Sequence, residues 1–235
     1  MTSAIPETKK QNKMFTFAAV LYVICMLFLG TERLLPFIKS MLGLKASAGL
    51  INILVFAAIS VSLFLLAFML PKANGGGKLF VPFFVLAGCY LLQIPTPVYS
   101  TVRRISETDR ILDTAELTSE IIRCCVSVCA FVFAAVGFGV LGLLFMLSKK
   151  QNQKRSFVWV LPVAAFLLST ILSGTKFGIN AINVVSFITS DAASFLSSKD
   201  LILWSLTSVP STVTFAVMLL YTVAAALIAT GNMKK

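Results

Sequence analysis

The sequence predicts an all-α integral membrane protein, a polytopic bundle of about six transmembrane helices with both termini in the cytoplasm. Three observations support this prediction. Apolar residues make up 58% of the chain and charged residues only 12%, whereas about a quarter of the residues in soluble domains are charged. Uncharged runs of about 20 residues, the length that crosses a bilayer, recur along the chain. The lysines and arginines cluster at the ends of these runs.

The basic segment 149–155 determines the predicted orientation. It contains four positive charges and no acid, and it separates the uncharged runs 124–148 and 157–175. Because short loops rich in lysine and arginine stay in the cytoplasm, we expect a cytoplasmic turn here. Counting spans outward from it places both termini on the same side. The segments predicted inside then hold more lysines and arginines than the longer outer segments, and a single acid, Glu7.

The whole chain, 1–235, is predicted to form one membrane domain. Its expected spans are residues 14–30, 49–70, 79–99, 124–148, 157–175 and 208–230. Between the first two, segment 34–48 has a helical apolar stripe interrupted by lysines and predicts a short interfacial helix. The first run also has features of a signal peptide, but Gly30-Thr31-Glu32-Arg33 is a poor cleavage site. We therefore expect an uncleaved first helix, with cleavage as the alternative.

Composition argues against several functional classes. The net charge of +11 flanks the spans, so we expect contact with the lipid bilayer and no nucleic-acid binding. The absence of histidine removes the commonest zinc and haem ligand and the usual general base of triads. No Walker A, HExxH or GxSxG motif occurs. We expect no catalytic residue, metal or cofactor, and predict that the chain is not an enzyme.

Two motifs inside the apolar runs are interpreted as packing features. Residues 137–142 match GxGxxG, but they lie within a continuous apolar run and not between a strand and a helix. Small residues there let a neighbouring helix approach closely. Cys125 and Cys129, one helical turn apart, are likewise interpreted as small packing residues, because two thiols alone make an incomplete metal site.

The strongest functional candidate is Lys176, the one lysine well inside an apolar region. If the fifth helix continues past it, Lys176, Asn180 and Asn183 share a face and could bind a polar or anionic solute. Gln93, in the third span, is a further candidate for the solute path. In the favoured alternative the helix reaches the outer interface near Lys176. Its ammonium then snorkels into water, and residues 177–188 form a surface segment.

The longest hydrophilic stretch, 100–123, is predicted to form an extramembrane helical loop. Ser106 with Asp109 is a possible N-terminal capping box. A helix from there places four acids on one face, Asp109, Asp113, Glu116 and Glu120. The acidic stripe is a candidate surface for binding a partner, with a solvated face as the simpler alternative.

Two functional hypotheses follow. The first is a small integral membrane transporter or permease subunit for a small polar or anionic solute, acting as a homo-oligomer or with other membrane subunits. The alternative is a non-catalytic membrane scaffold, assembly factor or sensor that acts through partner membrane proteins. A multi-pass protein of the cell membrane is expected. The compact loops and the lack of Asn-x-Ser/Thr sites favour a bacterial inner membrane.

Overall fold

The computed structural model describes residues 13–25, 27, 47–70, 79–107, 114–148, 156–190 and 198–233. For 47–53, 179–190, 198–210 and a few positions at helix ends, only the backbone is described. Within these ranges the chain forms helices and no strand, which confirms the predicted all-α bundle. The predicted interfacial helix 34–48 lies almost wholly outside the described residues.

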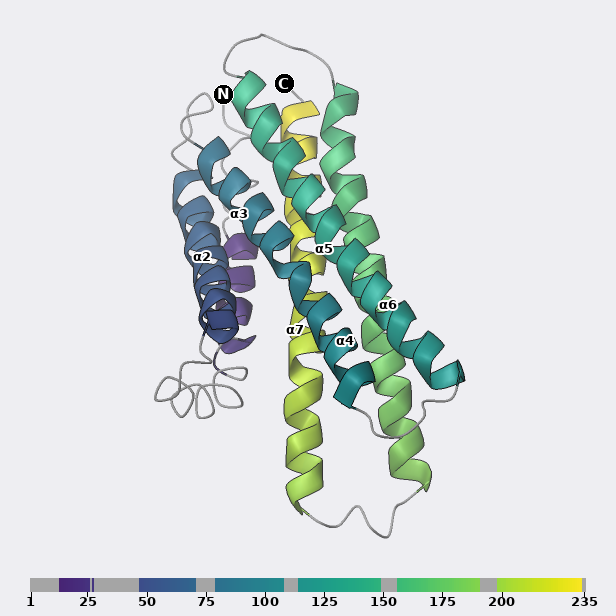
Figure 1. Cartoon of the computed structure of the whole chain (residues 1–235). Coiled ribbons are helices and arrows are strands. Elements are labelled where there is room, and N and C mark those ends of the chain that lie inside the picture. The colour runs from purple at the N-terminus through teal and green to yellow at the C-terminus, as the bar shows by residue number, and fades with distance from the viewer. Residues whose placement is uncertain are drawn as a thin grey trace.

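The helices lie side by side in one elongated bundle (Figure 1). In chain order they are the N-terminal helix Lys13–Cys25, α2 (Ser47–Met69), α3 (Phe80–Gln93), α4 (Pro95–Glu107), α5 (Thr114–Ser148), the 3-10 turn η2 (Ser156–Trp159), α6 (Val160–Ser190) and α7 (Ser198–Met233). Prolines occupy the first turns of α3, α4 and α6, where the missing N–H costs no intrahelical hydrogen bond.

Consecutive long helices run in opposite directions, so the bundle has two distinct ends (Figure 1). At one end α3 begins, α5 ends, α6 begins and α7 ends; we call it the Ser148 end. At the other α4 ends, α5 begins, α6 ends and α7 begins; we call it the Glu107 end. Ring contacts of Phe15 with Phe83 and hydrogen bonding of Tyr22 with Tyr90 show that the N-terminal helix runs parallel to α3. It therefore begins at the Ser148 end.

Helix length and surface chemistry indicate a membrane protein. Within the described residues, four helical stretches are long and apolar enough to cross a bilayer: Phe80–Val102, Leu117–Leu147, Val160–Gly178 and Ser211–Gly231. Two shorter apolar helices, Lys13–Cys25 and Leu54–Met69, complete the bundle. Large apolar side chains such as Phe68, Leu92 and Ile171 point outward. A lipid environment accommodates such a surface. The count of six spans and the cytoplasmic termini remain predictions.

The segment after the third predicted span remains helical for longer than expected. Ile94 forms a turn between α3 and α4, and its N–H donates to the carbonyl oxygen of Leu91. Pro95 and Pro97 cannot donate, so the helical pattern is interrupted there and then resumes as α4. Ser106 lies in the last turn of α4, so the predicted N-cap at Ser106 is wrong. Within the predicted loop 100–123, residues 100–107 belong to α4 and residues 114–123 to α5, while 108–113 lie outside the described residues.

Glycines on α5 bring neighbouring helices close, as predicted for the GxGxxG segment. A Cβ added to Gly137 would lie 2.8 Å from Cζ of Phe166 on α6, and one added to Gly142 would lie 3.2 Å from the ring of Phe84 on α3. Gly139 faces open space. The interpretation of Cys125 and Cys129 as packing residues is wrong, because both are exposed on the side of α5 that no described helix covers.

The centre of the bundle is a cluster of aromatic rings around three phenols, which we call the tyrosine cluster: Tyr22, Tyr90 and Tyr221. All three side chains are buried. Tyr90 Oη donates to Tyr221 Oη at 3.0 Å and is also hydrogen-bonded to Tyr22 Oη. Phe138 of α5 stacks on Tyr90 and meets Tyr221 edge to face. Because buried hydroxyls require partners, these hydrogen bonds hold the N-terminal helix, α3 and α7 together.

Helix α6 is continuous from Val160 to Ser190. The favoured expectation, that the helix stops near Lys176 and a separate surface segment follows, is therefore wrong for the backbone. Phe215 of α7 packs against Gly174 and stacks on Phe177, so α7 supports α6 on both sides of Lys176. This support explains why the glycines and polar residues at 173–178 do not end the helix.

Candidate functional site

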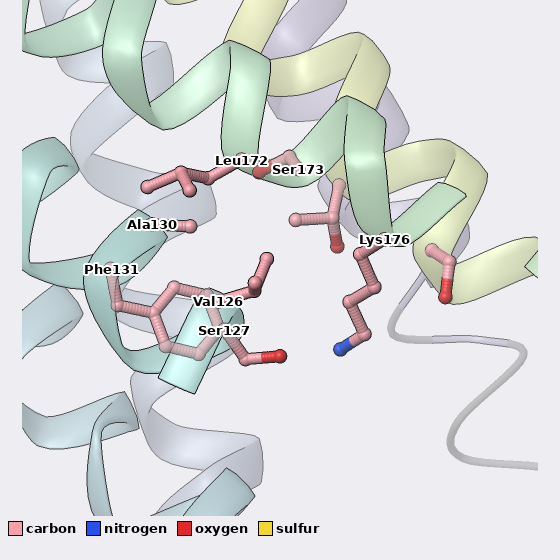
Figure 2. A pocket seen from close by; sticks show the side chains of 9 residues that line it. Val126, Ser127, Ala130, Phe131, Leu172, Ser173 and Lys176 are labelled. Carbon is pink, nitrogen blue, oxygen red and sulfur yellow. The ribbon is translucent and has the colours of Figure 1, made fainter. Parts of the chain in front are cut away.

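A cavity of about 90 Å³ lies between α5, α6 and α7, on the Glu107 side of the tyrosine cluster. Its lining residue Phe131 has its ring centroid 6.2 Å from that of Tyr90, so the cavity lies next to the tyrosine cluster. Its lining residues are Val126, Ser127, Ala130, Phe131, Leu172, Ser173, Lys176, Ser211 and Thr214 (Figure 2). Five of these nine residues have polar side chains and four are apolar, so the cavity is small and mixed in character.

Helical periodicity places these polar side chains on facing surfaces. On α6, Ser169, Ser173 and Lys176 follow each other at i, i+4 and i+7 and so share the inward face. Ser169 is at the closed end of this stripe, where its hydroxyl donates to the carbonyl oxygen of Ala130 at 2.8 Å. Ser173 and Lys176 lie further along this face of α6. Opposite them on α5 are the small side chains Ser127 and Ala130, which do not fill the space between the two helices and so leave the cavity.

Lys176 supplies the cavity's positive charge. Its side chain is half-buried and lines the cavity, and Figure 2 shows its ammonium group turned toward the hydroxyl of Ser127. The position is within a helix apolar enough to span a membrane, Val160–Gly178. An ionisable group in such a helix usually faces the bundle interior or water, and marks a solute or ion path.

Ser173 presents a buried hydroxyl without a partner. Its side chain is 6% exposed, and its Oγ makes no hydrogen bond to any described residue. The neighbouring Thr170 behaves differently, since its Oγ1 donates to the carbonyl oxygen of Phe166 at 2.8 Å and is also hydrogen-bonded to Thr222. An unsatisfied buried hydroxyl costs about 1–3 kcal/mol. The Oγ atom is enclosed by protein atoms and is not exposed to the cavity.

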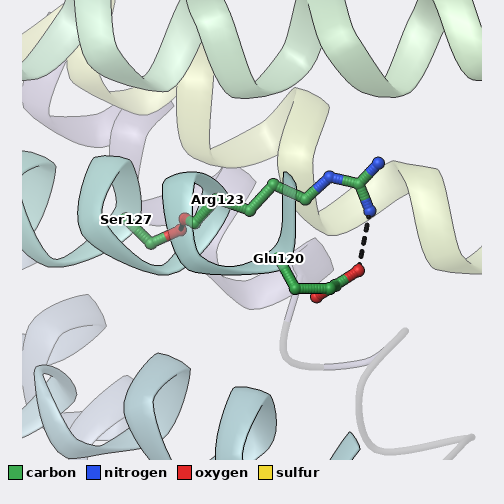
Figure 3. A network of polar contacts seen from close by, with 3 residues as sticks. All are labelled: Glu120, Arg123 and Ser127. Atoms are coloured by element: carbon green, nitrogen blue, oxygen red, sulfur yellow. Dashed lines mark hydrogen bonds and ion pairs between the residues drawn. The ribbon is translucent and has the colours of Figure 1, made fainter. Parts of the chain in front are cut away.

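An ion pair lies next to the cavity on α5 (Figure 3). Arg123 Nη1 donates to Glu120 Oε1 at 3.0 Å, and both side chains are partly buried. Ser127 Oγ donates to the carbonyl oxygen of Arg123 at 2.8 Å, which leaves the oxygen lone pairs of Ser127 available to accept. Arg123 Nε is buried without a partner among the described residues. The ion pair thus lies one turn from the cavity wall, toward the Glu107 end.

No protein-family model, curated protein or solved structure matches this chain.

The structure brings together only part of the residue set predicted for the solute path. Lys176 lines the cavity, whereas Gln93 does not. Gln93 is buried on α3, with Nε2 unpaired among the described residues. The backbone of α6 is helical through Asn180 and Asn183, the condition under which they share a face with Lys176, but their side chains lie outside the described part of the chain.

Of the four predicted partner-binding acids, the structure describes one side chain, that of Glu120, which pairs with Arg123. Asp109 and Asp113 lie outside the described residues, as does the side chain of Glu116. Their common acidic face therefore remains a prediction. In the described part of the chain, no three His, Cys, Asp or Glu residues come close enough together to hold a metal ion.

Sequence reasoning missed the hydroxyl residues of the cavity, Ser127, Ser173, Ser211 and Thr214. A signal was present on α6, because Ser169, Ser173, Lys176, Asn180 and Asn183 repeat at i, i+4, i+7, i+11 and i+14. Such a polar stripe on an otherwise apolar helix predicts an inward face. The contributions of α5 and α7 carry no such signal, since isolated serines and threonines occur throughout membrane helices and bond to their own backbone.

Proposed function

We propose that this protein carries a small polar or anionic solute across a cell membrane, as a transporter or permease subunit, and that the cavity between α5, α6 and α7 is part of the path. The observation that carries the proposal is the position of Lys176, which presents a charge to a partly open cavity from near the end of the apolar helical stretch Val160–Gly178. An ionisable side chain that faces a cavity between helices is typical of a solute path.

The surroundings of Lys176 support the same proposal. Four hydroxyl side chains converge on the cavity with it. One of them, Ser173, is buried and unpaired among the described residues. The ion pair of Glu120 and Arg123 lies one turn beyond the cavity, on the side from which a solute would arrive from the Glu107 end. A polar route through apolar helices needs such groups, because they replace the water that a solute loses.

The proposed topology has six spans with both termini in the cytoplasm, in a multi-pass protein of a bacterial inner membrane. Its support is the alternation of the helices, because it brings the start of the N-terminal helix, the α5–α6 connection and the end of α7 to the Ser148 end. The flanking sequences at these points are lysine-rich. α2 has 23 residues, about 34 Å of helix, which would cross the hydrocarbon core.

Stopped-flow light scattering of proteoliposomes tests the function. Purified protein in liposomes is exposed to gradients of formate, acetate, chloride, glycerol or urea. At least one solute is expected to equilibrate faster than in empty liposomes, and Lys176→Ala is expected to abolish the difference while the protein remains folded and inserted. Thr175→Ala is the matched control, because Thr175 is exposed on another face of α6. Unaltered flux in Lys176→Ala, or no flux for any solute, contradicts the proposal.

A scaffold, assembly or sensor role is the second candidate, acting through partner membrane subunits bound by residues 109–120. Its support is the acidic composition of that segment. In the described structure Glu120 already has an intramolecular partner, Arg123, which leaves it less suited to binding another protein. This role predicts full tolerance of Lys176→Ala and loss of a co-purifying membrane protein when the acids of 109–120 are neutralised.

A further inference from the structure

The junction between α3 and α4 lacks hydrogen bonds that would join the two helices into one. α3 ends at Gln93 and α4 begins at Pro95, so Ile94 alone separates them. In a continuous helix the N–H groups of residues 95 and 97 would donate to the carbonyl oxygens of Leu91 and Gln93. Both positions are proline and have no N–H. The carbonyl oxygen of Leu91 accepts from Ile94 instead, at 3.2 Å. Sharp helix bends occur at such prolines.

Packing differs on the two sides of this junction. Seven of the 14 residues of α3 are buried, and ring contacts join α3 to the N-terminal helix, α5 and α7. No described side chain of α4 is buried, and Tyr99 and Val102 are 67% and 59% exposed. α4 packs mainly on one neighbour, α5. Because segments with few buried contacts open at low free-energy cost, α3 is the fixed base and α4 is the element able to move.

Gln93, the last residue of α3, carries a second and independent sign of another arrangement. Its amide nitrogen Nε2 is buried and has no partner among the described residues. Buried donors are nearly always paired. Since Nε2 is enclosed by protein atoms, it gains an acceptor only if the residues around it rearrange. The junction with α4 directly follows it, and movement there is such a rearrangement.

The junction lies beside the cavity. Phe131 of α5 lines the cavity, and its ring packs on Tyr90 of α3. Tyr90 is three residues before Gln93, about one helical turn. From the junction α4 continues along α5, which forms one wall of the cavity, to the Glu107 end (Figure 1). A movement of α4 therefore changes the space next to this wall.

We infer that α4 is a hinged arm that pivots about residues 94–97 while α3 stays fixed, and that its position controls passage between the cavity and the Glu107 end. Hinges of this kind are a few residues at the ends of helices that absorb the change in backbone angles. The pivoting is a property of the fold and can be measured without any solute. The control of passage rests on the proposed function.

Distances between pairs of spin labels test the pivoting, in the full-length protein in liposomes with the native cysteines replaced. One label is placed at Leu54→Cys on α2, and the other at Tyr99→Cys after the junction or at Leu92→Cys before it. All three side chains are more than half exposed. We expect one narrow distance distribution for the Leu92 pair and two populations for the Tyr99 pair. A single narrow distribution for the Tyr99 pair overturns the inference.

Proline variants assign the pivoting to this junction. The double change Pro95→Ala and Pro97→Ala restores both N–H donors, so the Tyr99 pair is expected to show one population. Pro97→Ala alone restores one donor and should shift the populations in part. Both should fold, because no described side chain of α4 is buried. Pro162→Ala, in the first turn of α6, is the control and should leave both pairs unchanged. Two unaltered populations in the double variant overturn the inference.

Flux in liposomes separates this inference from the proposed function. The double proline variant is expected to lower the flux of a carried solute several-fold. Two populations in a wild type without flux support the hinged arm and contradict transport. Flux with a single Tyr99 population supports transport and overturns the hinged arm. Unaltered flux in a double variant that has lost one population overturns the control of passage by α4.

Discussion

The phenols of Tyr22, Tyr90 and Tyr221 are hydrogen-bonded to one another at the centre of the bundle, whereas some buried polar groups nearer the Glu107 end have no partner among the described residues. On that side Gln93 Nε2 and Arg123 Nε are unpaired among the described residues, as is Ser173 Oγ beside the cavity. Around the tyrosines, Phe138 and Phe166 fill the space with rings whose centroids are 4.7 Å apart. Around Ser173, small side chains leave a cavity.

If the proposed function holds, this difference separates a part of the bundle that stabilises the fold from a part that takes up a solute. Protein interiors normally pair their buried polar atoms, so a group of unpaired ones requires an explanation. In the tyrosine cluster the protein supplies every partner for the phenols. Toward the Glu107 end, Gln93 Nε2, Arg123 Nε and Ser173 Oγ have no such partner among the described residues. Changes at the tyrosine cluster should therefore affect folding, and changes at the cavity should affect binding and flux.

The largest stability effect is expected at Gly137, where Phe166 of α6 packs directly against α5. Gly137→Ala would place a Cβ 2.8 Å from Cζ of Phe166, whose ring is fully buried and fixed by Phe138 and Tyr221. We expect a loss of about 1–3 kcal/mol, as for other overpacked cores. Denaturant titration in mixed micelles measures the free energy of unfolding.

Gly139→Ala is the matched control, two residues along the same helix. Nothing lies within 4 Å of its Cβ position, so the change should be neutral or stabilise the helix by about 0.5–1 kcal/mol. Equal destabilisation by both changes would mean that close packing of α5 on α6 at Gly137 is not what holds this region together.

The next effect is expected for Tyr90→Phe, which removes the hydroxyl that joins Tyr22 to Tyr221. We expect a loss of about 1–2 kcal/mol, because two interhelical hydrogen bonds are lost and each contributes about 0.6 kcal/mol on average in a membrane protein. Tyr99→Phe is the control, since Tyr99 is 67% exposed. If Tyr90→Phe is as stable as that control in thermal unfolding, the tyrosine cluster does not stabilise the bundle.

A smaller effect is expected for Glu120→Gln. The change removes the charge that pairs with Arg123, and both side chains retain partial access to solvent, so the loss should be at most about 1 kcal/mol. Because salt screens such pairs, raising the ionic strength should narrow the difference between variant and wild type. A salt-independent loss of several kcal/mol would show that the pair is an essential part of the fold.

The smallest effect is expected for Gln93→Met, only one helical turn from Tyr90. Gln93 Nε2 has no partner among the described residues, so replacing the amide by a thioether of similar length should be neutral or slightly stabilising. A loss of more than about 1 kcal/mol in thermal unfolding would indicate that Gln93 is satisfied in the folded protein. The contrast between the two parts of the bundle would then be weaker.

Hydropathy is sufficient to predict the helical membrane class and most helices. A long uncharged run in a bilayer must form its backbone hydrogen bonds internally, and a helix does this. It failed where tertiary contacts override local signals. Pro95 and Pro97 interrupt the helical pattern, yet the helix resumes as α4. Lys176, flanked by Gly174 and Gly178, does not end α6, because the ring of Phe215 supports the helix there.

The sequence predicts only part of the candidate site, because the rest depends on contacts between helices. Lys176 was identified because a charge is conspicuous in an apolar run. The tyrosine cluster was not identified, because Tyr22, Tyr90 and Tyr221 are far apart in sequence. Each contributes one hydroxyl group to an otherwise apolar segment. Likewise, the unpaired hydroxyl of Ser173 is a property of packing, and no sequence pattern distinguishes it from the paired Thr170.

The most direct test is single-cysteine labelling of the membrane-embedded protein with a small water-soluble methanethiosulfonate reagent, in a background without the native cysteines. Ser127→Cys and Ser173→Cys should react, and formate should slow both reactions. Ala134→Cys, buried on α5 between the cavity and the tyrosine cluster, should not react. Lack of reaction at both cavity positions, or reaction at Ala134→Cys at the same rate, would contradict a solute-accessible cavity beside a closed aromatic core.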